Sequence, residues 1–235
     1  MNVLYQDAAL IAVDKPAGIH TAPREDGELD NLMAVVLAAF PEVCSVPGIK
    51  PFEHGLLHRL DRGTSGVVLF ARTAEAFQAL RSQFVAEETR KEYYAGCACA
   101  QTRNPGESFA VQSMFAPAGK GRSKVRIVMP QETRRRLLRG ATRTVYTTDA
   151  TVERTHQGRA LVMAVIQKGF RHQIRAHLSS AGLPIFGDDL YGVVVPQGAE
   201  ARMYLHASAI LLTSPITGKE LRIASPLPPS FLGLL

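Results

Sequence analysis

The feature that most restricts the fold is a series of short apolar runs, each ended by turn-forming residues. Seven of these runs are predicted to be strands: residues 10–13, 67–70, 93–100, 124–129, 142–148, 160–167 and 205–212. Three segments have helical spacing instead. Asp30 is predicted to cap a helix through about Phe40, Thr73 to start a second, and Gly182 to end a third over Phe170–Ala181. Because the strands outnumber the helices without alternating strictly with them, we expect an α+β fold with a largely antiparallel sheet.

Length and composition favour one domain over residues 1–235, since 46% hydrophobic residues can form a substantial core. The three cysteines are odd in number and form no Cys-x-x-Cys pair, which indicates reduced thiols and argues against a metal site. No segment resembles a signal peptide or the roughly 18 apolar residues of a membrane span. We therefore expect a monomeric cytoplasmic protein that does not associate with membranes.

The net charge of +6 is concentrated in one segment. Residues 119–143 contain nine basic residues and a single acid, Glu132, so this segment carries +8 and the rest of the chain −2. One interpretation is an ordinary solvated basic face. The other is a surface that follows nucleic-acid phosphates, since clustered Lys and Arg release counterions from them. The Arg-rich composition, with Tyr146 just beyond, favours RNA.

Within residues 54–70, HGLLHRLDRGTSGVVLF, the ionisable residues His58, Arg59, Asp61 and Arg62 and a Gly-Thr-Ser-Gly turn come directly before an apolar strand. Taken alone, this segment is a solvated edge turn. Several enzyme classes fit it poorly. A serine-hydrolase Gly-x-Ser-x-Gly fails because position 67 is valine, and Gly119-Lys120-Gly121 lacks the rest of a phosphate-binding loop. A glycosidase remains a minor option, with Asp188 or Asp189 as the second carboxylate beside Asp61.

The third helix is the second concentration of polar groups. Arg171 and Arg175 lie four residues apart, and for two arginines alone an exposed helix face is the simplest interpretation. His172 and His177 are five apart, which is the wrong spacing for a helical zinc pair. We expect no metal.

Taken together, these segments resemble the RluA-type pseudouridine synthases, which isomerise uridine in RNA. The family signature matches residues 58–66, His-Arg-Leu-Asp-Arg-Gly-Thr-Ser-Gly. Further matches follow the family's order: Asp14–Gly18, Lys91–Tyr93, Ala141–Tyr146, His172–His177 with Gly182–Asp188, and Leu205–Ala207 with Pro215. The resemblance extends from about residue 5 to about residue 230.

The resemblance implies a pseudouridine synthase fold, a mixed and largely antiparallel sheet in two lobes with a central catalytic cleft. It implies Asp61 as the catalytic carboxylate, Arg175 as its charge partner, and Tyr93 stacked on the flipped uracil. Candidate substrate-binding residues are Arg59, His58, Gln173 and Leu205. We expect His58 and Gln173 to hold the active-site loop through hydrogen bonds, and Leu205 fits ordinary core nearly as well. The reaction needs no redox step and no phosphate energy, so no cofactor is expected. The partner would be tRNA or rRNA, and the alternative is a catalytically silent RNA-binding protein on the same fold.

Two departures from the family pattern stand out. The family usually has Gly-Arg-Thr-His-Gln where this chain has Gly169-Phe170-Arg171-His172-Gln173, so no family role passes directly to Arg171. Many relatives also carry a small RNA-binding module before the Lys-Pro-Ala-Gly segment. Only about a dozen residues precede that segment here, so we expect a single catalytic domain without this appendage and a larger share of RNA binding by residues 119–143.

Overall fold

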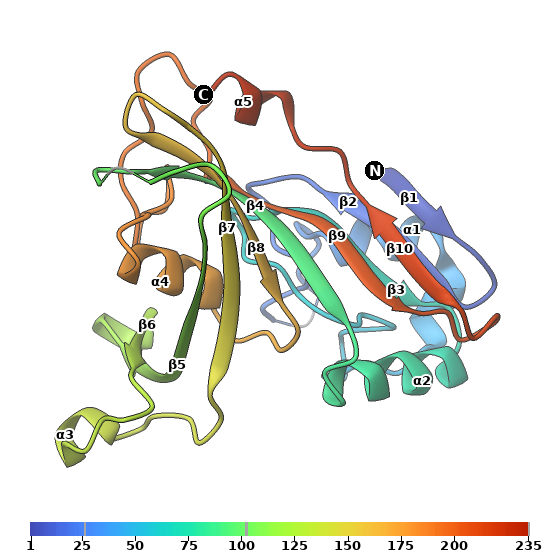
Figure 1. The fold of residues 1–235 in the computed structure, drawn as a ribbon. Helices are drawn as coiled ribbons and strands as arrows, with labels where there is room; N and C mark the ends of the chain where they lie inside the picture. Colours follow the sequence, from blue (N-terminus) through green and yellow to red (C-terminus); the bar gives the residue numbers. More distant parts are fainter. Residues whose placement is uncertain (26, 102, 235) are drawn as a thin grey trace. The chain divides into compact units, whose positions relative to one another are not determined.

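In a computed structural model, which describes residues 1–25, 27–101 and 103–234, the chain folds into two compact units. Unit 1 comprises Met1–Glu92 and His206–Leu227, and unit 2 comprises Tyr93–Leu205 and Pro228–Leu235. Strands predominate in both, as Figure 1 shows. The predicted α+β class with a largely antiparallel, mixed sheet is confirmed. In the described ranges no helix is long and apolar enough to cross a bilayer.

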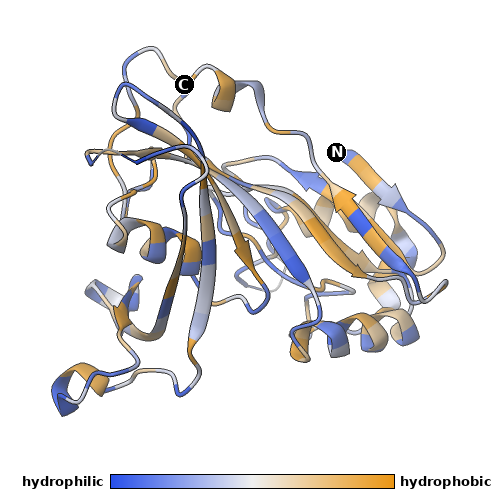
Figure 2. Cartoon of the chain, in the orientation of Figure 1, coloured by the Kyte–Doolittle hydropathy of each residue, from blue (hydrophilic) through white to orange (hydrophobic). Residues whose placement is uncertain are grey.

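Unit 1 is built on strands in the order β1-β2-β3-β9, with β10 also paired to β9. Its elements are β1 (Asn2–Gln6), β2 (Leu10–Lys15), α1 (Leu32–Ala39), the 3₁₀ helix η1 (Pro41–Ser45), β3 (Ser65–Ala71), α2 (Ala74–Val85), β9 (Leu205–Thr213), whose first residue belongs to unit 2, and β10 (Glu220–Ala224). All neighbouring strands are antiparallel except β3 and β9, which run parallel. Figure 2 shows the predominantly hydrophobic character of β9. One face of the sheet packs against α2, whose Leu80 is fully buried.

Unit 2 is built on strands in the order β4-β8-β7-β5-β6. Its elements are β4 (Arg90–Ala98), which starts in unit 1, β5 (Ser108–Ala118), the 3₁₀ helix η2 (Lys120–Arg122), β6 (Lys124–Val128), α3 (Arg135–Leu138), β7 (Tyr146–His156), β8 (Arg159–Ile166), α4 (Gln173–Ser180) and α5 (Pro229–Leu232). The strands β5 and β7 pair antiparallel, as do β7 and β8. A cluster around Phe115 packs α4 against β5, β6 and β7.

The helix ends differ from the sequence prediction in two places. The cap of α1 is Asn31 and not Asp30, because the Asn31 side chain accepts from the Ala34 N–H at 3.0 Å. The third predicted helix starts at Gln173, three residues later than expected, because His172 has a left-handed backbone (φ 58°) that cannot continue a helix toward the N-terminus. Thr73 does cap α2, and Gly182 follows α4 with φ 76°.

Candidate active site

The loop that carries Asp61 into β3 is fastened on both sides by contacts to its main chain. Before Asp61, the Thr21 hydroxyl donates to the Leu60 carbonyl (2.8 Å) and accepts from the Leu60 N–H (3.1 Å). After it, the Gly18 N–H donates to the Arg62 carbonyl, and Arg62 Nε donates to the Gly18 carbonyl, both at 2.8 Å. The backbone of Asp61 is therefore fixed from both flanking residues.

Lys15 reinforces this attachment from inside the unit. Its side chain is fully buried, and its ammonium donates to the carbonyls of Pro16 (2.9 Å), Ile19 (2.9 Å) and Arg62 (3.2 Å). An ammonium group is stable in a buried position when oxygen acceptors replace its water. The Lys-Pro-Ala-Gly segment and the Asp61 loop are thereby joined into one structure, which we call the loop clamp: Lys15, Gly18, Thr21, Leu60 and Arg62.

The end of the signature joins the parallel strand β9. Ser65 pairs with His206 and Gly66 with Ala207, and a Cβ at Gly66 would collide with the Ala207 carbonyl oxygen. Only glycine permits this approach, at a φ of 112°. The Ser65 hydroxyl lies 2.9 Å from His206 Nδ1, so the family's Leu-His-Ala segment supports the start of β3 directly.

The side chains of His58 and Lys91 both lie against the ring of Phe84. The imidazole stacks on Phe84 (ring centroids 5.6 Å apart), and the Lys91 ammonium lies 5.2 Å from the same ring. Burial lowers the pKa of His58 to about 3, with further contributions from Lys91 and Arg81, and burial lowers the pKa of Lys91 to about 8. The buried Nε2 of His58 has no hydrogen-bond partner among the described residues, so at this atom packing replaces the expected hydrogen bond.

Arg59 is partly exposed and is held from one side. Its Nη1 lies 3.1 Å from Oε1 of Glu53, whose carboxylate is 1% exposed. Sequence patterns offer no signal for Glu53, because a lone acid six residues away has no characteristic spacing to an arginine.

In unit 2, Arg175 lies in a cradle of side chains. Its Nε and Nη2 donate to the two oxygens of Asp188, both at 2.7 Å, and its guanidinium lies 5.4 Å from the ring centre of Tyr191. Burial alone would raise the pKa of Asp188. The hydrogen bonds and charge of Arg175, with the N–H groups of Leu190 and Tyr191, outweigh burial and bring that pKa below the ordinary value. Asp188 is therefore an ionised partner of Arg175, although its sequence context is typical of a turn.

Gln173 and His177 fasten α4 to its neighbouring strands. Gln173 Nε2 donates to the Thr147 carbonyl (2.9 Å) and to the Thr148 hydroxyl (3.1 Å). The fully buried His177 lies 2.8 Å from both Ser113 Oγ and Thr148 Oγ1, and burial lowers its pKa to about 4. These contacts orient the helix, and the two hydrogen bonds that Gln173 donates go to β7 and not to the Asp61 loop.

Phe170 and Arg171, where this chain departs from the usual family pattern, have separate contacts in unit 2. Phe170 stacks on Phe115 with ring centroids 4.9 Å apart. Arg171 is exposed, and its Nη2 donates to the carbonyls of Arg122 (2.6 Å) and Lys124 (3.3 Å). Arg171 thus ties the start of α4 to β6 and the turn before it.

The two remaining candidates are buried in unit 2. Tyr93 on β4 is 8% exposed, whereas Tyr94 is partly exposed, as expected for neighbours on opposite faces of a strand. Leu205 opens β9 and is 3% exposed.

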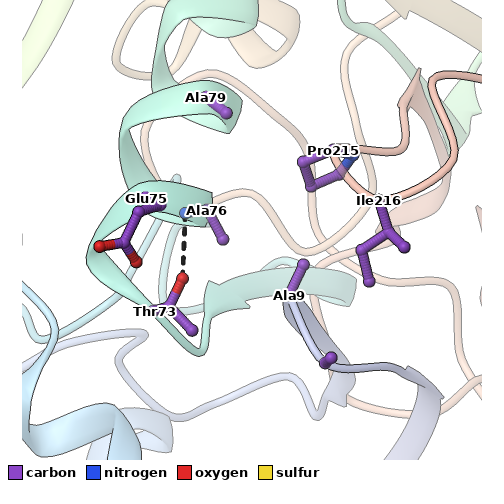
Figure 3. A pocket seen from close by; sticks show the side chains of 8 residues that line it. Ala9, Thr73, Glu75, Ala76, Ala79, Pro215 and Ile216 are labelled. Carbon is purple, nitrogen blue, oxygen red and sulfur yellow. Dashed lines mark hydrogen bonds between the residues drawn. The ribbon is translucent and has the colours of Figure 1, made fainter.

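Unit 1 also has a surface pocket, which Figure 3 shows from close by. It is lined mainly by alanines, Pro215 and Ile216, with Thr73 and Glu75 at the start of α2. The Thr73 hydroxyl accepts from the Ala76 N–H (3.1 Å), the bond drawn in Figure 3, and none of the candidate residues lines the pocket. Across residues 1–25, 27–101 and 103–234, no three His, Cys, Asp or Glu side chains are arranged to hold a metal ion.

Comparison with known proteins defines the class. Residues 9–180 match the family model described as RNA pseudouridylate synthase. The chain therefore belongs to the RluA family of RNA pseudouridine synthases, which are isomerases.

Three relatives show how far the similarity extends. An uncharacterized RNA pseudouridine synthase of Bacillus subtilis is 31% identical over 97% of this chain and 69% of its own length. The ribosomal large subunit pseudouridine synthase D of Xanthomonas campestris is 30% identical over 97% of this chain and 66% of its own. The dual-specificity RNA pseudouridine synthase of Vibrio cholerae is 31% identical over 92% and 78%. The chain thus spans only about two thirds of the length of the first two.

Solved structures agree on the fold. The human RNA pseudouridylate synthase domain containing 4 matches with a TM-score of 0.72 and 21% identity, over 100% of this chain and 91% of that one. The human domain containing 1 matches with 0.73 and 20%, over 99% and 86%. The expected pseudouridine synthase fold is confirmed.

Proposed function

We propose that this chain converts specific uridines of tRNA or rRNA into pseudouridine, using Asp61 as the catalytic carboxylate. The observation that carries the proposal is the loop clamp, which holds the Asp61 loop by its main chain on both sides of the carboxylate. A fixed position is what a reacting group needs, because misplacement by about 1 Å costs roughly a hundredfold in rate.

The reaction breaks the C1′–N1 glycosidic bond, turns the uracil and forms a C1′–C5 bond, while C5 loses its proton and N1 gains one. Asp61 either attacks the sugar or assists proton removal from it, and in both cases it acts as an anion. A nearby arginine favours the ionised state, and Arg175 is proposed for that role. Tyr93 is proposed to stack on the uracil, with its hydroxyl available for proton transfer.

The uridine must leave its stack before reaction, at a cost of a few kcal/mol. We assign Arg59 to the vacated space or to a neighbouring phosphate, because its partly exposed side chain is anchored at one end by Glu53. His58, Gln173 and Leu205 are proposed to shape the substrate site from their buried or half-buried positions. The enzyme is proposed to act as a cytoplasmic monomer without a cofactor.

Mapping pseudouridine across total RNA from cells with and without this gene tests the proposal and identifies the RNA. The expected result is the loss of one or a few pseudouridines in tRNA or rRNA, restored by the wild-type gene and not by an Asp61→Asn variant. Unchanged maps, together with RNA binding by the purified protein, would support the catalytically silent alternative.

A further inference from the structure

Tyr191 packs against Arg175 but is not one of the predicted site residues. Its ring centre lies 5.4 Å from the Arg175 guanidinium, and its N–H donates to Asp188 Oδ1 at 3.1 Å. Asp188 fixes one edge of the guanidinium, formed by Nε and Nη2, through its paired hydrogen bonds. Tyr191 supplies the aromatic face, so its tilt helps to set the plane in which Arg175 can lie.

The Tyr191 hydroxyl is anchored on a different element. It accepts from the Val125 N–H at 2.6 Å, and His172 Nδ1 lies 3.1 Å away. Val125 belongs to β6, the last strand in the order, whose strand partner within the described residues is β5. The outward N–H groups of an edge strand need acceptors, and here a phenol from the Arg175 cradle provides one. Burial raises the pKa of Tyr191, so the phenol remains protonated at neutral pH.

The strand β6 is in turn fastened to the basic helix. Arg126 Nη2 donates to the Leu137 carbonyl of α3 at 2.6 Å. Arg135 and Arg136 on α3 are exposed and make no side-chain hydrogen bond or ion pair within the described part of the chain. A continuous series of bonded contacts therefore runs from the basic helix, through β6 and the Tyr191 hydroxyl, to the face of Arg175.

We propose that Tyr191 is a positioning residue that couples RNA contact at α3 to the orientation of Arg175. When phosphates hold α3 and β6 in place, the Val125 N–H fixes the Tyr191 hydroxyl, and the ring then holds the guanidinium. RNA bound away from this basic surface leaves Arg175 less well oriented. The enzyme thereby gains selectivity for RNA that reaches both places. This inference rests on the proposed function and on RNA binding by residues 119–143.

The test compares Tyr191→Phe, which keeps the ring on Arg175 and removes the hydroxyl, with Tyr204→Phe as the matched control. The Tyr204 hydroxyl also bonds to a main-chain group of unit 2, the Glu200 carbonyl at 3.1 Å, but Tyr204 does not touch Arg175. The substrate is bulk tRNA and rRNA from cells lacking this gene, assayed in single turnover at saturating enzyme. Tyr191→Phe should lower the rate constant about two- to tenfold, the effect of one removed hydrogen bond, and leave RNA affinity within about twofold. Tyr204→Phe should change neither.

Non-additivity then separates coupling from a general structural effect. In the wild-type background, Arg135→Gln with Arg136→Gln should lower both RNA affinity and the saturated rate constant. In the Tyr191→Phe background the same pair should lower affinity alone. Equal rate constants for Tyr191→Phe and Tyr204→Phe, or rate effects that simply multiply, would overturn the inference. A wild-type protein that forms no pseudouridine would instead contradict the proposed function.

Discussion

The Asp61 loop of unit 1 and the Arg175 cradle of unit 2 are held in place by different means. The loop clamp acts on main-chain groups: Lys15 and Thr21 bond to carbonyls, and a glycine amide bonds to another. The cradle holds Arg175 through two side chains. The Asp188 carboxylate accepts a hydrogen bond from it at 2.7 Å, and the ring centre of Tyr191 lies 5.4 Å from the guanidinium. The clamp should therefore survive a change of the Asp61 side chain, whereas the position of Arg175 depends on the charge of its neighbour.

The largest expected effect comes from removing the charge of Asp61 without disturbing the clamp. Asp61→Asn should lower the single-turnover rate by about three orders of magnitude or more, roughly 4 kcal/mol of barrier, because the amide can neither attack nor take a proton. RNA affinity should persist, since phosphate contacts dominate it. Product from a preparation free of the host enzyme would remove Asp61 from its assigned role.

Asp188→Asn tests the cradle and should cost about 3 kcal/mol of stability, because it leaves a buried guanidinium opposite a neutral amide. The rate of pseudouridine formation by Asp188→Asn should also fall, because Arg175 loses its charged partner. Asp189→Asn is the matched control: its carboxylate is 86% exposed and lies 3.3 Å from Arg175 Nη2, so it should change stability by less than about 0.5 kcal/mol. Equal effects at the two positions would mean that exposed charge, and not the buried pair, holds Arg175.

The ion pair between Arg175 and Asp188 also predicts how the free energy of unfolding depends on pH. The pKa of Asp188 lies below its ordinary value in the folded protein. Its stabilising contribution is therefore fully present above the ordinary pKa of 3.8 and is lost as the pH falls through the folded value. The difference in unfolding free energy between wild type and Asp188→Asn should shrink on acidification below about pH 4. A difference that is constant from pH 7 to pH 2 would show that the charge of Asp188 is not the stabilising element.

Lys15→Met tests how much the hydrogen bonds of Lys15 in the loop clamp contribute to the free energy of unfolding. It leaves buried carbonyls without their donor and should cost about 2–3 kcal/mol in denaturant unfolding. Lys50→Met is the control, because that side chain is 51% exposed. If Lys15→Met were as mild as Lys50→Met, the clamp would depend on the Gly18 and Thr21 contacts alone.

Much of this arrangement was predictable from local patterns, and most of the missed features depend on contacts between residues far apart in the sequence. Turn chemistry located the Asp61 loop before β3, and the Thr73 cap and Gly182 end were predicted correctly because capping is local. The strands β1, β5 and β10 were not predicted. In β5 the polar and apolar residues alternate only in part, and its place is set by pairing with β6 and β7.

Partners distant in sequence also escaped prediction. Asp188 follows Arg175 by thirteen residues, and Thr21 precedes Leu60 by thirty-nine, so neither has a periodic signature. The Gly187-Asp188 pair was visible as part of the family segment, but its turn-like composition concealed an ion pair. Glu53 and Tyr191 likewise acquire their significance only from the folded contacts.

The smallest expected effect concerns the basic surface that the proposed coupling connects to the cradle. Arg134 is already paired with Glu132, at 2.7 and 2.9 Å, whereas Arg135 and Arg136 extend from α3 without such a partner in the described ranges. Neutralising Arg135 and Arg136 to Gln should flatten the log–log dependence of RNA affinity on salt by roughly 0.7 to 0.9 for each phosphate that the protein no longer neutralises. Arg134→Gln should flatten it less per charge, because Glu132 must first give up its ion pair before Arg134 can meet a phosphate. A salt slope unchanged by the Arg135 and Arg136 substitutions would make residues 119–143 a solvated face. The coupling through Tyr191 would then have no RNA contact to transmit.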